Sequence, residues 1–299
     1  SESERANCLS FTVTRSIERY KFTCKSRKKK PKFAVFISFS VEKSYLRSLI
    51  SYFMKESHLF YAPQLSQTLQ LPEEEAAHAV RVLRRKEGDD LWITDGAGHF
   101  FDCTVSAVGT GRHPQCFVTI ENEYAWQQHW ASDIHLAVAP TKNSDRIEWL
   151  AEKSTEIGFN GLHFLDCANS ERRVLKTERV EKIVVSAAKQ SHKGRFPQIS
   201  ALEKFKTFIA RPFEGNKYIA HCYAQTDIDG TTEKPFLYDV VEKGKPSLVL
   251  IGPEGDFSVE EVRLAASLGF QSISLGESRL RTETAALVAV QLMNLKQSH

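Results

Sequence analysis

The feature that most constrains the fold is a regular alternation of strand-like and helix-like segments over the second half of the sequence. Strand character is found at residues 134–138, 161–165, 217–221, 247–251 and 272–275, and helical periodicity at residues 144–158, 178–190, 259–268 and 283–296. Ile147, Leu150 and Ala151, for example, recur at the spacing of one helix face. Because strands that alternate with helices form mainly parallel sheets covered on both faces, residues 132–299 are predicted to be an α/β domain.

The region before this domain has a different pattern. A helical stretch opens at Pro72, and short strands are predicted at residues 91–94, 100–105 and 115–120, with turn signals between them at Asp95-Gly96 and at residues 109–111. Several short strands and one helix predict a small β-barrel domain over residues 54–125. Residues 121–131 are polar, hold two tryptophans and are expected to be a linker.

Residues 1–53 differ from the rest of the chain in charge. They hold twelve Lys or Arg and four Glu, a balance of +8, whereas the remaining residues carry a balance of −5. A transit peptide, a disordered RNA-binding arm and upstream sequence joined to a protein that starts near Met54 all fit this composition, and we favour the third. The segment is expected to be disordered or foreign to the native protein, and residues 33–41 have the character of a strand with no obvious pairing partner nearby. The net charge of +3 is therefore no evidence that the folded body binds nucleic acid.

The composition disfavours several classes of protein. No run of about 18 apolar residues occurs, which argues against a membrane-spanning helix. The six cysteines are far apart and form no C-x-x-C pair, which argues against a zinc site and fits a reducing cytosol. No G-x-G-x-x-G follows a predicted strand, so a Rossmann dinucleotide site has no support.

Two segments near the C-terminus carry the strongest indication of a ligand site. In the first, SLVLIGPEGDFS (residues 247–258), a buried strand runs into a turn whose two glycines allow a close approach to a ligand. Ser258 and Glu261 have the spacing of a capping box, so a helix is expected to begin at Val259. Ligands of parallel sheets bind at the carboxyl ends of strands, where this turn lies. A plain β-turn is the alternative.

The second segment, LGESRLRTETA (residues 275–285), repeats this arrangement of strand, loop and helix. The helix is expected to begin near Thr282, where its free N–H groups and positive dipole end suit a carboxylate or a phosphate. Arg281 and Glu283 flank that start. A salt bridge and a capping residue are the structural alternative for these two side chains.

Taken together, the two motifs "LIGPEGDFS…E" and "LG-x-x-x-LRTETA" resemble the signature of the bacterial 16S ribosomal RNA uridine-N3 methyltransferases, the small-subunit methyltransferase E type of the SPOUT superfamily. "DRIEWLAEKSTEIG" (residues 145–158), "SAAKQSHKGRFPQI" (186–199) and "HAVRVLRRKEGD" (78–89) agree with it in order and spacing. The resemblance covers about residues 54–299. One departure is Asp256, where the family often has a further glycine.

The resemblance implies a trefoil-knotted SPOUT methyltransferase domain preceded by a PUA-like RNA-binding barrel. It also implies a cytoplasmic homodimer that binds no metal and no membrane, and that uses S-adenosyl-L-methionine. The residues implied to hold this cofactor are His221, Ile251, Gly252, Pro253, Glu254, Gly255, Leu275, Gly276, Leu280, Arg281, Thr282, Thr284 and Ala285.

The RNA partner is implied to be 16S rRNA in the assembled 30S subunit. Side chains expected to contact RNA are Arg81, Arg84, Arg85, Arg172, Lys189, Lys193 and Arg195. For the first three, a solvated helix face is an equally good interpretation. For the cluster from Lys189 to Arg195, cations at a helix end also suffice as a structural explanation, although such groups dominate affinity for RNA.

The implied reaction is methylation of uridine N3, an atom that is a poor nucleophile until its proton leaves. Such a site needs a general base or a cation that stabilises the N3 anion. Arg281 suits the second role, and Glu254 or Glu283 the first. The alternatives are a SPOUT methyltransferase acting on tRNA or on a ribose 2′-hydroxyl, and a non-catalytic RNA-binding or ribosome-assembly protein.

Overall fold

The structure, a computed structural model, describes residues 10–16, 19–25, 58–228, 230 and 233–299 of the 299-residue chain. The chain divides into two compact units, Ser1–Phe53 and Met54–His299. In the first unit, β1 (Ser10–Ser16) and β2 (Arg19–Lys25) pair as an antiparallel hairpin. The strand character noted at residues 33–41 lies outside the described residues. The interpretation of residues 1–53 stays a prediction.

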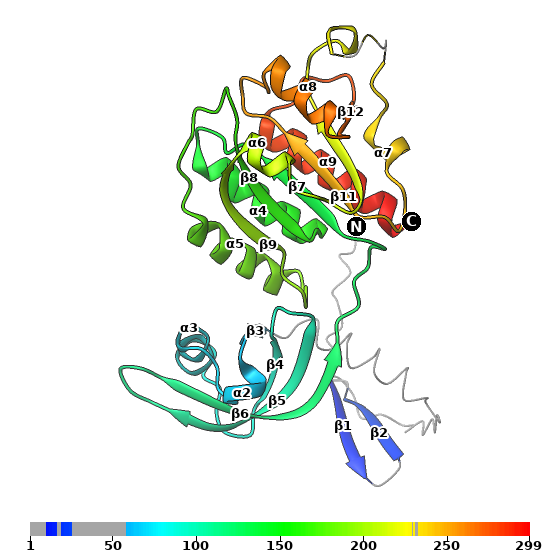
Figure 1. The fold of residues 1–299 in the computed structure, drawn as a ribbon. Helices are drawn as coiled ribbons and strands as arrows, with labels where there is room; N and C mark the ends of the chain where they lie inside the picture. Colours follow the sequence, from blue (N-terminus) through cyan, green and yellow to red (C-terminus); the bar gives the residue numbers. More distant parts are fainter. Residues whose placement is uncertain (1–9, 17–18, 26–57, 229, 231–232) are drawn as a thin grey trace, which may run out of the picture. The chain divides into compact units, whose positions relative to one another are not determined.

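The second unit opens with a four-stranded sheet that we call the small β domain, residues 58–125. Its strands, in spatial order, are β3 (Leu59–Tyr61), β4 (Asp90–Thr94), β5 (His99–Gly109) and β6 (Gln115–Ala125) (Figure 1). The pairing of β3 with β4 is parallel, and the other two are antiparallel. Gln70, shortly after β3, bridges to Phe117 at the opposite edge. The sheet therefore curls toward closure, as the predicted barrel requires.

Short helices accompany this sheet: α2 (Leu65–Thr68), α3 (Glu73–Ala77) and a π-helix, η1 (His78–Val82). The helix expected from Pro72 is therefore present, but its second half is wound as a π-helix, in which the Leu83 N–H donates to the His78 carbonyl at 3.0 Å. Buried apolar side chains such as Phe60, Ile93 and Phe101 give the domain a core of its own. Single π turns often occur at functional sites.

The rest of the second unit is an α/β domain built on one six-stranded sheet. Its strands are β7 (Ile134–Val138), β8 (Gly161–Asp166), β9 (Gln198–Lys204), β10 (Asn216–Ala220), β11 (Ser247–Ile251) and β12 (Gln271–Ile273). Its helices are α4 (Ser144–Ile157), α5 (Thr177–Gln190), α6 (Phe205–Ile209), η2 (Gln225–Asp227), α7 (Leu237–Val240), α8 (Val259–Ser267) and α9 (Thr282–Ser298).

All pairings in this sheet are parallel, and the spatial order is β12-β10-β11-β7-β8-β9. The chain fills one side of the sheet first, from β7 to β9, and then crosses to β10 through α6. β11 returns to the centre, between β10 and β7. The predicted parallel α/β domain is therefore confirmed, with a strand order that the periodicity alone did not indicate.

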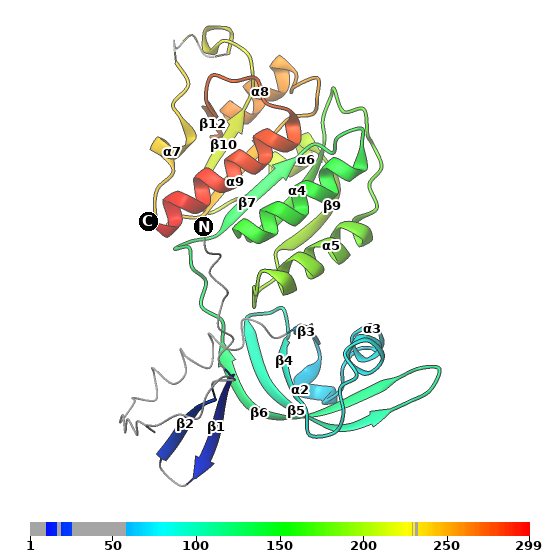
Figure 2. The same cartoon turned by 180° about the vertical axis from the view of Figure 1, so that it is seen from behind.

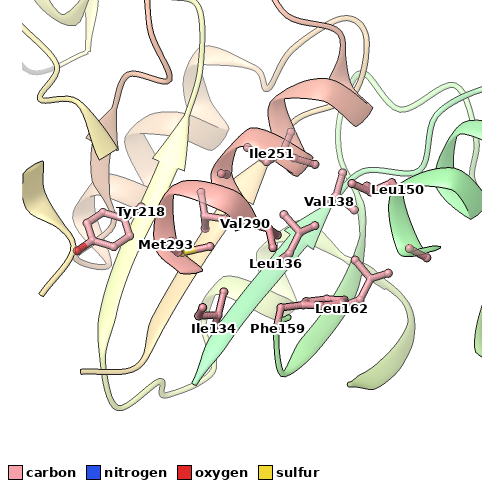
Figure 3. Packing of buried hydrophobic residues seen from close by; sticks show 14 of the residues in the cluster. Ile134, Leu136, Val138, Leu150, Phe159, Leu162, Tyr218, Ile251, Val290 and Met293 are labelled. Atoms are coloured by element: carbon pink, nitrogen blue, oxygen red, sulfur yellow. The ribbon is translucent and has the colours of Figure 1, made fainter. Parts of the chain in front are cut away.

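Helices cover both faces of the sheet, as predicted. On one face, α4, α5 and α9 pack against buried side chains of the strands, such as Leu136 and Phe164 (Figure 2). Figure 3 shows Val290 and Met293 of α9 lying on this layer. On the other face, α6 and α8 cover the alternate residues of the same strands, among them Ala137. Because both faces are buried, every residue of β11 is apolar or small.

Several segments differ from the prediction, among them the short helices α2, η2 and α7, which were not expected. β6 continues to Ala125, so the first half of the expected linker at 121–131 is strand. The edge strand β9 and the short helix α6 after it were not expected. The sequence of β9, QISALEK, is largely polar because the strand pairs only with β8 and is half-exposed, so it lacks the apolar run of a central strand.

The small β domain and the α/β domain contact each other through the segment after α5. The Gly98 N–H donates to the Gly194 carbonyl at 3.0 Å, and the Phe196 N–H donates to the Gly96 carbonyl at 2.9 Å. A side chain at Gly194 would overlap Trp126, since its Cβ would lie 2.4 Å from the tryptophan Cβ. Through these two backbone hydrogen bonds, residues 194–196 pair with the β4–β5 turn in the manner of a short antiparallel strand.

His135 and His163 form a stacked pair on the face of the sheet covered by α6, with His135 Nδ1 3.1 Å from His163 Nε2. Burial lowers the pKa of both rings, and that of His163 falls to about 4, helped by His135 and Arg211. The folded state therefore holds both imidazoles neutral at pH values where the unfolded chain would bind protons.

We expect the free energy of unfolding to fall as the pH is lowered from about 6.5 toward 4, by at most about 3 kcal/mol from His163 alone. Chemical denaturation at a series of pH values measures this change. His163→Gln should flatten the profile in that window. An unchanged profile in the variant would assign the acid sensitivity to other groups.

Candidate active site

The loops at the carboxyl ends of the parallel strands gather at one edge of the large sheet, the usual ligand-binding edge of such folds. β10 lies between β11 and β12, so the two loops identified in the sequence, residues 252–258 and 274–281, flank the loop that begins at His221. His221 is 8% exposed, and its Nε2 lies 3.0 Å from Ser272 Oγ on β12. The structure therefore brings His221 and both segments together.

The first of these loops, residues 252–258, is tightly packed. A Cβ at Gly252 would lie 3.0 Å from the Phe257 nitrogen, and one at Gly255 would lie 3.2 Å from Asn169 Cβ. Ile251 and Pro253 are buried in the turn. Close packing within the protein thus accounts for both glycines, as the β-turn alternative requires, and does not by itself indicate a ligand.

Polar contacts connect this loop to its neighbours. Glu254 Oε1 accepts a hydrogen bond from the Lys142 N–H at 2.9 Å, which joins it to the loop after β7. Asn169 Nδ2 donates to the carbonyls of Gly255 and Asp256 at 3.2 and 3.1 Å, which joins it to the loop after β8. The loop is therefore held in one conformation.

The predicted capping box at the start of α8 is confirmed. Ser258 Oγ accepts from the Glu261 N–H at 3.2 Å, and Glu261 Oε2 accepts from the Ser258 N–H at 2.9 Å. Glu261 does more than the sequence indicated, because its Oε1 also accepts from the Ala168 N–H at 2.8 Å. Its carboxylate thus fixes the helix start and the end of β8 at once.

The second loop, residues 274–281, is more open than the first. Gly276 has φ 111°, a backbone conformation that favours glycine, and a Cβ there would meet nothing within 4 Å. Leu275 and Leu280 are half-buried, whereas Arg281 is exposed. Arg281 makes no side-chain hydrogen bond or ion pair with any residue that the structure describes, so its guanidinium is available to a ligand.

Helix α9 begins at Thr282, as predicted, and the side chain of its N-cap residue, Arg281, makes no capping hydrogen bond. The first N–H groups of a helix have no partner within the helix. In α9 these groups belong to the turn that holds Thr282, which is buried, and Thr284 and Ala285, which are half-buried. An uncapped helix start that follows the open loop at Gly276 is an arrangement suited to a polar or anionic ligand group.

Glu283, in the first turn of α9, is the most buried of the candidate catalytic carboxylates. Its Oε1 lies 3.3 Å from Arg146 Nη1 of α4, and the two side chains are 10% and 37% exposed. Its Oε2 is buried, with no hydrogen-bond partner among the described residues. The salt bridge expected as a structural alternative therefore forms, but with Arg146 rather than with Arg281.

A polar pocket of about 360 Å³ opens beside this ion pair. It is lined by Lys142, Asn143, Arg146, Glu171 and Glu254. Arg146 thus faces the pocket and also pairs with Glu283. Arg146 was not among the site residues expected from the sequence, because its position there indicates only the polar face of α4.

The small-domain arginines differ in their contacts. Arg81 donates to the carbonyls of Gly111 and Arg112 at 2.7 and 2.8 Å, so it supports the tip of the β5–β6 hairpin. Arg84 is exposed and has φ 54°, a left-handed conformation directly after the π-helix. Arg85 is half-buried, and its Nε has no hydrogen-bond partner among the described residues.

The basic residues of the α/β domain are partly engaged within the protein. Arg172 donates to the carbonyls of Thr141 and Lys142. Lys189 pairs with Glu75 of the small β domain, and Lys193 lies 6.0 Å from the ring centre of Trp130, where burial lowers its pKa. Arg195 is exposed. Their contacts with RNA stay predictions, and the structure adds a supporting role for the first three.

Comparison with known proteins agrees with this organisation. A family model described as RNA methyltransferase domain matches residues 128–294, more than half of the chain. The chain belongs to this RNA methyltransferase family. A second model, described as RNA methyltransferase PUA domain, matches residues 71–115. The prediction of a PUA-like domain ahead of a methyltransferase domain is therefore confirmed.

Several relatives of this methyltransferase are similar along most of the chain. The Ribosomal RNA small subunit methyltransferase E of Bacillus subtilis is 26% identical over 76% of this chain and 90% of its own. The crystal structure of a "probable rRNA-methyltransferase" from Porphyromonas gingivalis has 44% identity and a TM-score of 0.73, covering 80% of this chain and 98% of that one. A methyltransferase from Legionella pneumophila, solved with the bound cofactor SAM, has 26% identity and a TM-score of 0.70 over the same shares.

Two further observations concern other kinds of site. Within the described part of the chain, no group of three or more His, Cys, Asp or Glu side chains is placed to hold a metal ion. No helix among the same residues is long and apolar enough to span a membrane.

Proposed function

We propose that this methyltransferase transfers a methyl group from S-adenosylmethionine to N3 of a specific uridine in 16S rRNA, as a 16S rRNA (uracil-N3)-methyltransferase. The observation that carries the proposal is the site at the ends of β10, β11 and β12, where the uncapped start of α9 lies beside the exposed Arg281 and the buried Glu283. Membership of the family and the relatives named above support it. We further propose that it acts in the cytoplasm as a homodimer on the assembled 30S subunit.

The residues present fit S-adenosylmethionine. When bound, this cofactor supplies an electrophilic methyl group on a sulfonium centre. The half-buried side chains of Leu275 and Leu280 offer apolar surface, and the first N–H groups of α9 offer donors. The open space at Gly276 leaves room for a ligand against the backbone. The remaining residues proposed for this pocket are His221, Ile251, Gly252, Pro253, Glu254, Gly255, Thr282, Thr284 and Ala285, together with the backbone of Arg281, whose side chain is left to the RNA base.

We also propose that the strand-end loops form the trefoil knot typical of SPOUT methyltransferases. The strand order supports this proposal, because β11 enters between β10 and β7 after both are in place. The chain then returns through α9, which packs on α4 and β7.

Glu283 is the better of the two candidate proton acceptors. Its Oε2 is buried and has no hydrogen-bond partner among the described residues, whereas Glu254 is exposed and its Oε1 accepts from the Lys142 N–H. Arg146 holds the other oxygen of Glu283, which fixes the direction of the carboxylate. We propose that Glu283 accepts the N3 proton, while Arg281 stabilises the negative charge that develops on the uracil ring. The target uridine has to be unstacked to reach them.

Isothermal titration calorimetry with S-adenosylmethionine tests the cofactor part of this proposal. We expect saturable binding to the full chain. Heat that does not saturate, together with an unchanged unfolding temperature, would favour the non-catalytic RNA-binding or ribosome-assembly protein. Binding of the cofactor without methylation of 16S rRNA would favour a methyltransferase that acts on tRNA or on a ribose hydroxyl.

A further inference from the structure

Two charged side chains hold the backbone just after β10. The Cys222 N–H donates to Asp256 Oδ2 at 2.7 Å, and Lys234 Nζ donates to the carbonyls of His221 and Tyr223 at 2.5 and 2.9 Å. Tyr223 Oη donates to the Phe257 carbonyl at 2.7 Å. Three consecutive residues are therefore held by contacts with other parts of the chain.

The two charged residues lie in different parts of the chain. Asp256 belongs to the loop after β11. Lys234 is placed by the end of β12, because the Ser274 N–H donates to the Pro235 carbonyl at 2.8 Å. The segment that carries His221 is thus held by a carboxylate from the loop after β11 and by a lysine whose neighbour is bonded to the end of β12, and charge-assisted hydrogen bonds of this kind are stronger than neutral ones.

The backbone of Asp256 indicates that its carboxylate matters. Asp256 has φ 62°, a left-handed conformation that glycine adopts without strain and that aspartate tolerates less well. A glycine would therefore serve the turn at least as well. What aspartate adds is its carboxylate, which accepts from Cys222 and, through Oδ1, from the Phe257 N–H at 2.7 Å.

We infer that Asp256 and Lys234 are positioning residues that fix residues 221–223 as one wall of the cofactor pocket. This inference rests on the proposed function, since it assigns these residues to the affinity for S-adenosylmethionine. Neither side chain needs to touch the cofactor. Their effect is to preorganise the backbone around His221, so that binding does not have to order it.

Asp256→Gly tests the contribution of the carboxylate without straining the turn. The substitution removes the carboxylate, and glycine adopts the left-handed backbone conformation of this position readily. Hydrogen exchange of the full chain without cofactor tests the hydrogen bonds themselves. We expect faster exchange in peptides that cover residues 221–223, with little change elsewhere and an unfolding temperature within about 3 °C of the wild type. Unchanged exchange in these peptides would overturn the inference.

Calorimetry with S-adenosylmethionine then tests the consequence. We expect Kd to rise about tenfold in Asp256→Gly and in Lys234→Met, and about threefold in Asp256→Asn, with kcat at saturating cofactor within about threefold of the wild type. Because both residues hold the same segment, the double variant should lose less than the product of the two single effects.

The matched controls are Glu214→Gln and Lys206→Met, which remove one charge each from exposed positions outside these loops. Wild-type affinity in the Asp256 and Lys234 variants, beside a wild type that binds the cofactor, would overturn the inference and leave the proposed function standing. A wild type that binds no S-adenosylmethionine would overturn both.

Discussion

Replacing Glu283 with glutamine is expected to lower the rate constant of methyl transfer by about 10²–10⁴-fold, the range typical of a lost general base. Glutamine keeps the size and hydrogen-bonding shape of the side chain but cannot accept the N3 proton. The buried Oε2 of Glu283 and the salt bridge from Oε1 to Arg146 are the reasons to expect this effect here. Single-turnover kinetics with saturating RNA and S-adenosylmethionine measure the chemical step without product release.

Two variants make this result specific. Glu277→Gln removes an exposed carboxylate from the neighbouring loop and should change the rate less than threefold or so, as surface substitutions usually do. Glu254→Gln tests the other candidate base. A larger loss in Glu254→Gln than in Glu283→Gln would contradict the assignment and make the Glu254 carboxylate the proton acceptor.

Replacing Arg281 with alanine is expected to reduce turnover by about 10²–10³-fold, while the Kd for S-adenosylmethionine changes less than about threefold. The side chain is exposed and makes no hydrogen bond or ion pair with a residue that the structure describes, so its removal leaves no unpaired partner among them. The loss should therefore appear where negative charge develops on the uracil ring. Calorimetry and single-turnover kinetics on the same preparation separate binding from chemistry.

Arg281→Lys should recover part of the rate, because it restores the charge without the planar guanidinium. Arg279→Ala, an exposed arginine of the same loop, is the matched control and should retain most of the activity. Parallel loss of cofactor binding and turnover in Arg281→Ala would make Arg281 a cofactor or structural residue.

Local patterns predicted the elements of the fold well. The buried strand β11, the capping box of Ser258 and Glu261, and the start of α9 at Thr282 all lie where the sequence placed them. Each depends on neighbours a few positions away, such as apolar runs and capping spacing, so a sequence window contains the information.

Contacts between distant segments could not be predicted in the same way. Arg146 and Glu283 are far apart in the sequence, and their pairing depends on α9 returning to α4. Lys189 was interpreted from its basic neighbours, but its partner Glu75 belongs to another domain. A charge pattern shows that cations are present, and only the fold shows which of them are already paired.

The catalytic candidates illustrate both cases. The sequence indicated Glu254 and Glu283 as candidate bases, but it did not show which of the two carboxylates points into the site. Burial and hydrogen bonding separate them, since the Glu254 carboxylate joins two loops whereas Glu283 keeps one oxygen without a partner among the described residues. In the sequence, Asp256 stands out only as a departure from the family. Its contact with Cys222 depends on a loop over 30 residues earlier in the chain.

The most direct test of the proposed function is the identity of the methylated nucleoside. Purified 30S subunits that lack the modification are incubated with the protein and S-adenosylmethionine, and the digested 16S rRNA is analysed by nucleoside mass spectrometry. We predict a gain of 3-methyluridine at a single position, which is lost with Glu283→Gln. A 2′-O-methylated nucleoside, methylation of tRNA in place of 16S rRNA, or no methylation by a protein that binds S-adenosylmethionine would contradict the proposal.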